Sequence, residues 1–147
     1  MYKHILLPTD GSELSAKAVA AGVQLAKALG ARVTGLHVAP NPPSRPLENW
    51  AHGDKDYQQH LKALLESQAA MSLEVIKSAA QQAGVECECG YVWGDSPYEK
   101  IIEAARKGGC DLIFMACHGK KGAAAVVLGS ETVKVLTHSP VPVLAYR

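Results

Sequence analysis

The chain has 147 residues, of which 48% are hydrophobic and 20% charged. These figures are typical of one soluble globular domain, which we expect to span residues 1–147. The 15 Lys and Arg residues nearly balance the 14 Asp and Glu residues, giving a formal net charge of +1 that argues against a nucleic-acid partner. No apolar run reaches the roughly 18 residues that span a bilayer, and residues 1–7 lack the pattern of a secretory signal. We therefore expect a cytoplasmic protein with no membrane partner, whose four cysteines are reduced thiols.

Short apolar runs alternate with longer helical patterns along the chain. Strands are predicted at residues 5–7, 33–38, 85–92, 112–116 and 141–145. Helices are predicted at residues 12–29, 57–83, 96–108 and 130–138. Continuous apolar runs are typical of strands buried on both faces, and the alternation of strand and helix implies right-handed crossovers. The predicted fold class is therefore α/β: a five-stranded parallel sheet with helices on both faces.

Two of the predicted helices begin at recognisable capping residues. Ser12 is a candidate N-cap for the first helix, whose apolar stripe ends at Gly30. At the third helix, Ser96 can cap the N-terminus, Pro97 suits the first helical position, and Glu99 completes a capping box. We therefore expect each of these two helices to begin at a serine whose side chain accepts a backbone hydrogen bond.

Prolines mark two further features of the chain. Residues 40–56 contain four prolines, and such a long irregular connection is either a surface loop or a functional flap. Pro142 lies inside the last predicted strand, and because proline cannot donate a ladder hydrogen bond, this strand is expected at an edge of the sheet. Since a bare apolar edge invites pairing, we expect a second copy of the chain to cover it.

Candidate ligand-binding residues follow the first and fourth strands, because ligands of open α/β sheets bind beyond the carboxyl ends of the strands. Asp10 follows the first strand and could either bind a ribose hydroxyl or form a local turn. Gly119 and Gly122 follow the fourth strand, and Gly129 with Ser130 opens the next helix. Backbone amides at such glycines and at a helix N-terminus suit a phosphate group.

Several motifs together resemble the universal stress protein family. They are Pro8-Thr9-Asp10-Gly11-Ser12, Leu36-His37-Val38, and Ala116-Cys117-His118-Gly119 followed after nine residues by Gly129-Ser130. The terminal run Pro140-Val141-Pro142-Val143-Leu144 also fits, so that the resemblance covers the whole chain. The resemblance implies the strand order 3-2-1-4-5 of an adenine nucleotide alpha hydrolase-like fold. It also implies a homodimer through the fifth strand, at Val141, Val143, Leu144 and Ala145.

One branch of this family binds ATP through the pattern G-x-x-G-x9-G-[S/T], and the resemblance implies a role for each matching residue. The phosphates would contact Gly119, Gly129, Ser130 and Thr132. Asp10 would hold the ribose, and the adenine would lie against Val38 and Met115, with Pro8 and Thr9 nearby. Apart from the resemblance, His118 could touch a phosphate, act as an acid-base group or orient the loop. ATP is the expected ligand, with AMP or ADP as alternatives and Mg²⁺ as an optional companion of the phosphates.

Ala116 departs from the family pattern, which has glycine at this position. If the backbone needs a positive φ there, alanine is costly. If the glycine only leaves room beside the ribose, one methyl group is tolerable. The two cases predict opposite outcomes for nucleotide binding, and the sequence leaves both open.

The cysteines offer a weaker set of functional candidates. Cys87 and Cys89 alternate with glutamates and are best explained as small buried apolar residues, because no paired Cys-x-x-Cys motif suggests a metal site. Cys117 lies beside the proposed anion loop and is a candidate for redox sensing.

The sequence thus favours a stress-response regulatory protein that binds an adenine nucleotide without an assembled catalytic set. Two alternatives stay open. One is a nucleotide-free dimeric interaction protein of the same fold, which Ala116 favours. The other is a slow ATPase or self-phosphorylating enzyme, with a serine or threonine near the loop as the acceptor.

Overall fold

The computed structural model describes residues 1–42, 54–118 and 128–147 and contains five strands and four helices in strict alternation. The strands are β1 (His4–Thr9), β2 (Arg32–Ala39), β3 (Cys87–Trp93), β4 (Leu112–Ala116) and β5 (Val143–Tyr146). The helices are α1 (Glu13–Leu29), α2 (Asp54–Ala83), α3 (Pro97–Gly108) and α4 (Ser130–His138). All strand pairs are parallel and their order is β3-β2-β1-β4-β5, which confirms the predicted fold class and strand order.

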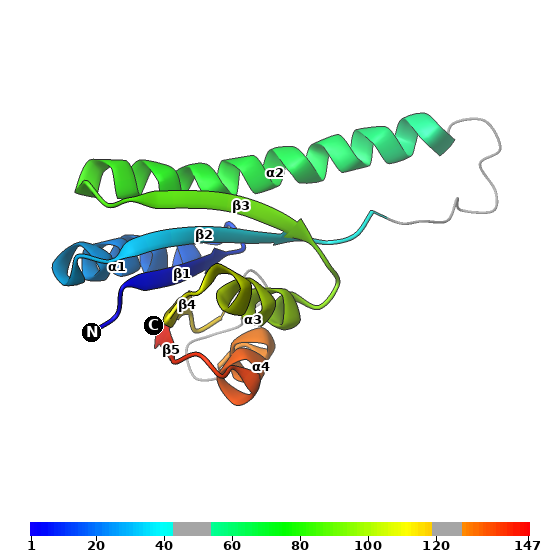
Figure 1. Ribbon diagram of the computed structural model, residues 1–147. Coiled ribbons are helices and arrows are strands. Elements are labelled where there is room, and N and C mark those ends of the chain that lie inside the picture. Colours follow the sequence, from blue (N-terminus) through cyan, green and yellow to red (C-terminus); the bar gives the residue numbers. More distant parts are fainter. Residues whose placement is uncertain (43–53, 119–127) are drawn as a thin grey trace.

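Helices cover both faces of the sheet, with α1 and α2 on one side and α3 and α4 on the other (Figure 1). Successive residues of a strand point to opposite faces, so Ile5 and Leu7 enter the core beneath α1 and α2, whereas Leu6 enters the core beneath α3 and α4. All three side chains are at most 1% exposed. This burial explains why the first run is apolar without alternation.

The strand β1 continues through Pro8 to Thr9, two residues beyond the predicted stop. The carbonyl of Lys3 accepts from the N–H of Arg32, the first residue of β2, and the carbonyl of His4 accepts from the N–H of Asp111, just before β4. Because successive residues of a parallel strand address alternate neighbours, Pro8 lies on the β4 side, where it offers no N–H. The β1–β4 pairing extends only to Leu6, so these two strands part at their carboxyl ends while β1 stays paired with β2.

The two helix caps predicted from the sequence have different outcomes. Ser12 is the N-cap of α1, and its hydroxyl accepts a 3.1 Å hydrogen bond from the N–H of Ser15, as expected. The capping box at Ser96 was wrong: with ψ at 86°, this residue makes no side-chain cap bond. The backbone N–H of Tyr98 instead donates to a carboxylate oxygen of Glu131 at 2.9 Å, so a residue of α4 caps α3.

Some element bounds also differ from the predictions. β5 begins at Val143, so Pro142 precedes the strand rather than lying within it, although its carbonyl still accepts from the N–H of Ile113. β3 begins at Cys87 because the N–H of Val85 closes the end of α2 by bonding to Ala80. β5 remains an edge strand, as predicted. Among the described residues no helix is both long and apolar enough to cross a membrane.

The caps give a stability prediction with an internal control. Replacing Ser12 by alanine removes the acceptor for the N–H of Ser15 and should lower the free energy of unfolding by about 1 kcal/mol. Replacing Ser96 by alanine removes no cap bond and should change it by less than about 0.5 kcal/mol. Urea unfolding of both variants measures the difference, and equal losses would contradict the assignment of the caps.

Candidate functional site

A cavity of about 560 Å³ lies at the carboxyl ends of β1, β2 and β4. The chain passes to β2 on one side of β1 and reaches β4 on the other, so the cavity lies at the point where the strand order reverses. The parting of β1 and β4 after Leu6 opens the sheet at this place. The residues that line the cavity are Pro8, Thr9, Asp10, Ser15, Leu36, Val38, Asp95, Pro97, Ile101, Met115, Ala116, His118, Gly129, Ser130, Glu131 and Thr132.

The structure brings together all of the site residues predicted from the sequence that it describes. These are Pro8, Thr9, Asp10, Val38, Met115, Ala116, His118, Gly129, Ser130 and Thr132. Gly119, together with Lys120, Lys121 and Gly122, lies outside the described residues, as does most of the proline-rich segment. The shared cavity establishes that the ten residues are neighbours, while their roles toward a ligand stay a prediction.

Asp10 forms the local turn that the sequence offered as one alternative, and it also lies at the cavity. One carboxylate oxygen accepts a 2.9 Å hydrogen bond from the N–H of Ser12, which makes the local turn. The same side chain lines the cavity. Gly11 adopts φ = 76°, a conformation that favours glycine, and its N–H bonds to the hydroxyl of Thr9 at 3.1 Å. The turn therefore fixes the carboxylate at the rim of the cavity.

The end of β1 is tied to its neighbours by two buried side chains. The Nδ1 of His37 lies 3.0 Å from the carbonyl oxygen of Thr9, and because a carbonyl only accepts, Nδ1 carries the proton. The hydroxyl of Thr9 lies 3.0 Å from that of Ser15 on α1. Both contacts hold the floor of the cavity where strand pairing with β4 has ended.

The N-terminus of α4 opens into the cavity without a capping side chain, since its N-cap residue is Gly129. The N–H of Gly129 bonds to the carbonyl of Cys117 at 2.8 Å. A Cβ at Gly129 would lie 3.0 Å from the Cα of His118, closer than side chains usually approach, so glycine favours the close approach of the helix start to the loop. Thr132 donates its hydroxyl proton to the carbonyl of Ala116 at 3.1 Å, which anchors the first turn of α4 to the end of β4.

This arrangement leaves the first N–H groups of α4 as the positive end of the helix dipole at the cavity. An anion is the ligand that such a helix start accommodates best.

Ala116 occupies a regular strand position, paired with Tyr146 of β5. The strand backbone is extended there, so alanine carries none of the strain that a positive φ would impose. The residue is 8% exposed and lines the cavity, where its methyl group adds bulk rather than strain. Of the two cases left open by the sequence, the structure supports the one in which the family's glycine only provides room.

Sequence reasoning missed several residues of the cavity. Asp95 follows β3, and its two carboxylate oxygens accept from the backbone N–H and the side-chain amide of Asn41 at 3.0 and 2.9 Å. The side-chain hydrogen bond from Asn41, helped by the backbone one, holds the pKa of Asp95 below its ordinary value. The rule that selected Asp10, position just after a strand, would also have selected Asp95. Glu131 also lines the cavity and accepts a hydrogen bond from the N–H of Tyr98, a contact that no sequence pattern predicts.

The thiol of Cys117 lies 3.0 Å from the Nδ1 of His118, beside the cavity, but its residue is only 3% exposed. This burial limits the access of oxidants, and a redox role for Cys117 stays a prediction. Among the described residues, no group of three or more His, Cys, Asp or Glu side chains is placed to hold a metal ion.

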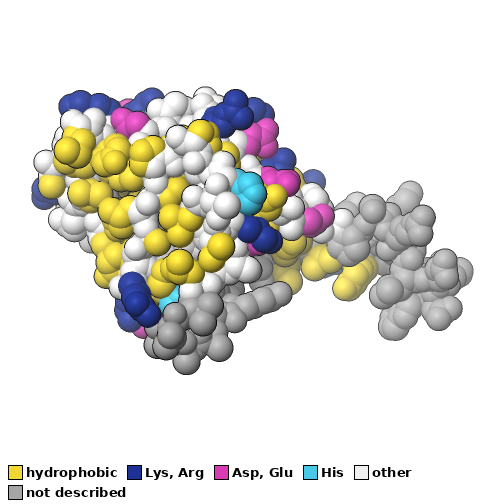
Figure 2. Space-filling view, turned by 90° about the horizontal axis from the view of Figure 1, so that it is seen from below, with side chains coloured by type: hydrophobic (Ala, Val, Ile, Leu, Met, Phe, Trp, Pro, Cys, Tyr) yellow, Lys and Arg dark blue, Asp and Glu magenta, His cyan; other side chains and the backbone are white. Residues whose placement is uncertain are grey.

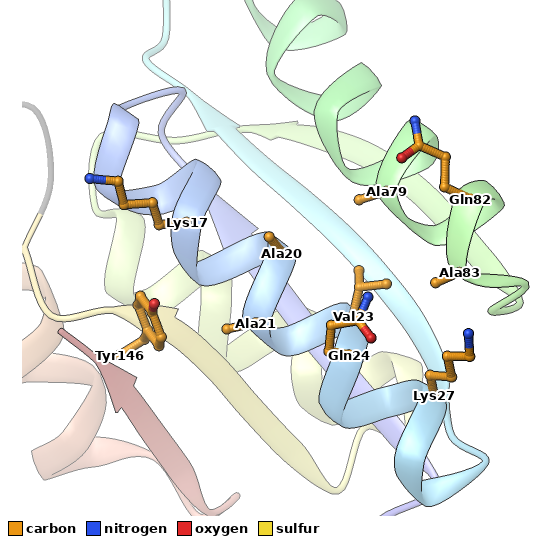
Figure 3. Close-up of a pocket in the computed structure, with 10 residues that line it drawn as sticks. All are labelled: Lys17, Ala20, Ala21, Val23, Gln24, Lys27, Ala79, Gln82, Ala83 and Tyr146. Atoms are coloured by element: carbon orange, nitrogen blue, oxygen red, sulfur yellow. The ribbon is translucent and has the colours of Figure 1, made fainter.

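A second, larger depression of about 670 Å³ lies between α1 and the end of α2 (Figure 3). Its floor consists of small side chains such as Ala20, Ala21 and Ala79, and Lys17 and Lys27 lie toward opposite ends of α1. No site residue predicted from the sequence lines it. It lies mainly on helical faces, with Tyr146 as the one lining residue from the carboxyl end of a strand, so we assign the binding chemistry to the smaller cavity.

The sheet order and the cavity at its reversal point define an open α/β protein of the kind that binds ligands at a switch point. A sequence model of the universal stress protein family matches residues 1–147. The chain therefore belongs to the universal stress protein family, as its motifs indicated.

Curated relatives agree with this assignment. The chain is 31% identical over 147 residues to universal stress protein MJ0531 of Methanocaldococcus jannaschii, covering 100% of this chain and 83% of the relative. It is also 31% identical over 149 residues to universal stress protein YxiE of Bacillus subtilis, with 100% of both chains covered.

Among solved structures, MJ0577 is 32% identical with a TM-score of 0.77, covering 99% of this chain and 95% of the other. UspA of Lactobacillus plantarum is 24% identical with a TM-score of 0.81, covering 99% of this chain and 98% of the other, and at this identity the likeness shows the fold alone.

Proposed function

We propose that this protein binds an adenine nucleotide, with ATP favoured, in the cavity at the carboxyl ends of β1, β2 and β4, and that nucleotide occupancy regulates a stress response. The observation that carries the proposal is that the uncapped N-terminus of α4 and the carboxylate of Asp10 line the same cavity. A nucleotide needs both features, an anion site for its phosphates and a hydrogen-bond acceptor for its ribose.

The cavity also offers an apolar region suited to a base. Leu36, Val38, Ile101 and Met115 line it, and they come from three different elements. A cavity of about 560 Å³ falls within the range of roughly 300–1,000 Å³ that is usual for small-molecule and cofactor sites. A lining that combines apolar and polar side chains suits a planar adenine joined to a polar tail.

Solved neighbours support the choice of ligand class. They include a universal stress protein in complex with cAMP, an Arabidopsis thaliana family member with AMP bound and an Archaeoglobus fulgidus universal stress protein in complex with dAMP. Their identities to this chain are 24%, 16% and 18%, so the likeness itself establishes only the shared fold. The proposal therefore rests on the residues of this chain, and the neighbours indicate which ligands to test.

Isothermal titration of the full chain with ATP and AMP tests the proposal, and Asp10→Asn identifies the site. The wild-type protein should bind ATP with a dissociation constant below about 100 μM, equivalent to about −5.5 kcal/mol. Asp10→Asn keeps an oxygen for the N–H of Ser12 but removes the charge, and should weaken binding at least about tenfold. Glu13→Gln makes the same charge change on the surface of α1 and should leave the affinity unchanged. No heat of binding to the wild type, or equal losses in both variants, would overturn the proposal.

Ala116 separates nucleotide binding from the nucleotide-free alternative. Because the residue is extended and strand-paired, Ala116→Gly relieves no backbone strain and should change ATP affinity by less than about threefold. If the glycine variant binds ATP and the wild type does not, the methyl group closes the site and the protein is the nucleotide-free form. The same titration decides this point.

We further propose a homodimer through β5. This strand is a sheet edge, and Leu144 is 39% exposed, while Val143 packs partly against the core of its own chain. Figure 2 looks at the side of the molecule that carries α4 and β5 and shows hydrophobic side chains gathered there. Val133 and Leu136 of α4, which the sequence reasoning did not select, are 44% and 40% exposed. An exposed apolar edge of this kind favours pairing with a second copy.

Light scattering coupled to size-exclusion chromatography tests the dimer. Leu144→Lys introduces a charge at the exposed edge and should weaken self-association at least about tenfold, because a charge would be buried unpaired at the interface. Leu64→Lys places the same charge on α2, at a residue that is 54% exposed, and should leave the dimer intact. A wild-type protein that elutes as a monomer contradicts the proposal.

A further inference from the structure

The strand β3 carries two thiols that lie side by side at the edge of the sheet. Cys87 and Cys89 are separated by one residue, so their side chains point to the same face, and their sulfur atoms are 3.5 Å apart. Both are partly exposed, whereas Cys110 and Cys117 are buried. The sequence suggested small buried apolar residues, but the structure places this pair within reach of solvent.

The neighbours of Cys89 hold its sulfur in one position. Gly35 lies opposite it in the β2–β3 register, and a Cβ at Gly35 would come within 2.6 Å of the Cys89 sulfur. The same hypothetical Cβ would lie 2.8 Å from the Cδ1 of Ile76 on α2. The Cys89 sulfur thus packs closely between Gly35 of β2 and Ile76 of α2, and the thiol of Cys87 is its hydrogen-bonding partner.

The hydrogen bond between the two thiols favours a thiolate on one of them. The hydrogen bond from Cys87 lowers the pKa of Cys89 to about 7, against the effect of its partial burial. Lys77 of α2 lowers the pKa further, while Glu74 of the same helix opposes it. The pKa of Cys87 is raised by its hydrogen bond to Cys89 and by the negative charge of the Cys89 sulfur. One sulfur is therefore suited to attack, and the other retains its proton until the first has reacted.

We propose that Cys87 and Cys89 form a redox-active dithiol that reacts with small-molecule disulfides and closes reversibly into a Cys87–Cys89 disulfide. The Cys89 thiolate attacks one sulfur of the disulfide RSSR, whose S–S bond breaks and releases the first RS⁻. Cys87 then loses its proton, and its thiolate attacks the Cys89 sulfur and expels the second RS⁻. The two cysteines lose two electrons, RSSR gains two, and the two cysteine protons appear on two molecules of RSH.

Strand geometry makes the product a reversible one. Residues two apart in a strand have Cα atoms about 6.6 Å apart, near the upper limit for a disulfide, and their parallel Cβ atoms lie beyond the roughly 4.5 Å that the bond spans. Closure therefore requires the backbone of the edge strand β3 to shift. A bond that forms near this limit is more easily reduced than an unstrained structural disulfide. The Cys87–Cys89 pair therefore suits a disulfide that forms and is reduced again, rather than a permanent structural disulfide.

The sequence allows the pair to be followed without interference from the other thiols. Cleavage after Lys and Arg places Cys87 and Cys89 in one peptide, residues 78–100, and Cys110 and Cys117 in another, residues 108–120. The reduced full-length protein is treated with glutathione disulfide, its remaining thiols are alkylated, and both peptides are analysed by mass spectrometry. Peptide 78–100 should lose both free thiols, gain no stable glutathione, and regain the thiols on reduction. Peptide 108–120 should be modified at least about tenfold more slowly.

Two single variants separate the roles of the sulfurs. Cys87→Ser should trap glutathione on Cys89, because no second thiol remains to expel it. Cys89→Ser should slow the first modification at least about tenfold, because the thiol of higher pKa remains. Circular dichroism shows whether each serine variant is folded. A persistent glutathione adduct on the wild-type pair, or equal rates for both peptides, would overturn the proposal.

Discussion

The site depends on one missing hydrogen-bond donor in the middle of the sheet. Pro8 lies on the side of β1 that faces β4, and pairing between these strands extends only to Leu6. β1 remains fixed by its pairing with β2 and by the bond from His37 to Thr9, so the sheet opens on one side only. The opening is the cavity, and the turn at Asp10 and the start of α4 meet there because each follows a strand that borders it.

The glycine positions of the phosphate motif make different physical demands on the chain. At Gly129 the Cα of His118 leaves little space for a side chain, so the close approach of α4 to the loop favours glycine. At Ala116 the backbone is extended and strand-paired, and the methyl group costs only cavity space. A departure from the family pattern at residue 116 therefore has a different meaning from one at residue 129.

Most of the fold was predictable because it follows from local signals. Apolar runs without alternation indicated buried parallel strands, and Ser12 and Gly30 mark the two ends of α1 as expected. The errors arose where tertiary contacts replaced local ones. Ser96 has the composition of a cap, but Glu131 from α4 supplies the acceptor instead. The position of Asp95 at the cavity was open to the same reasoning that found Asp10. The spacing of Cys87 and Cys89 places both on one face of β3, whereas the packing of Cys89 against Gly35 depends on the pairing of β2 with β3.

The most direct test of the central claim is a backbone amide NMR titration of the full chain with ATP in the presence of Mg²⁺. We predict that the largest shifts occur at Asp10, Val38, Ala116 and the first turn of α4, with little change at Ala20 and Ala79 of the α1–α2 depression. Shifts concentrated in the α1–α2 depression, or none at saturating nucleotide, would contradict the assignment of the cavity between β1 and β4 as a nucleotide site.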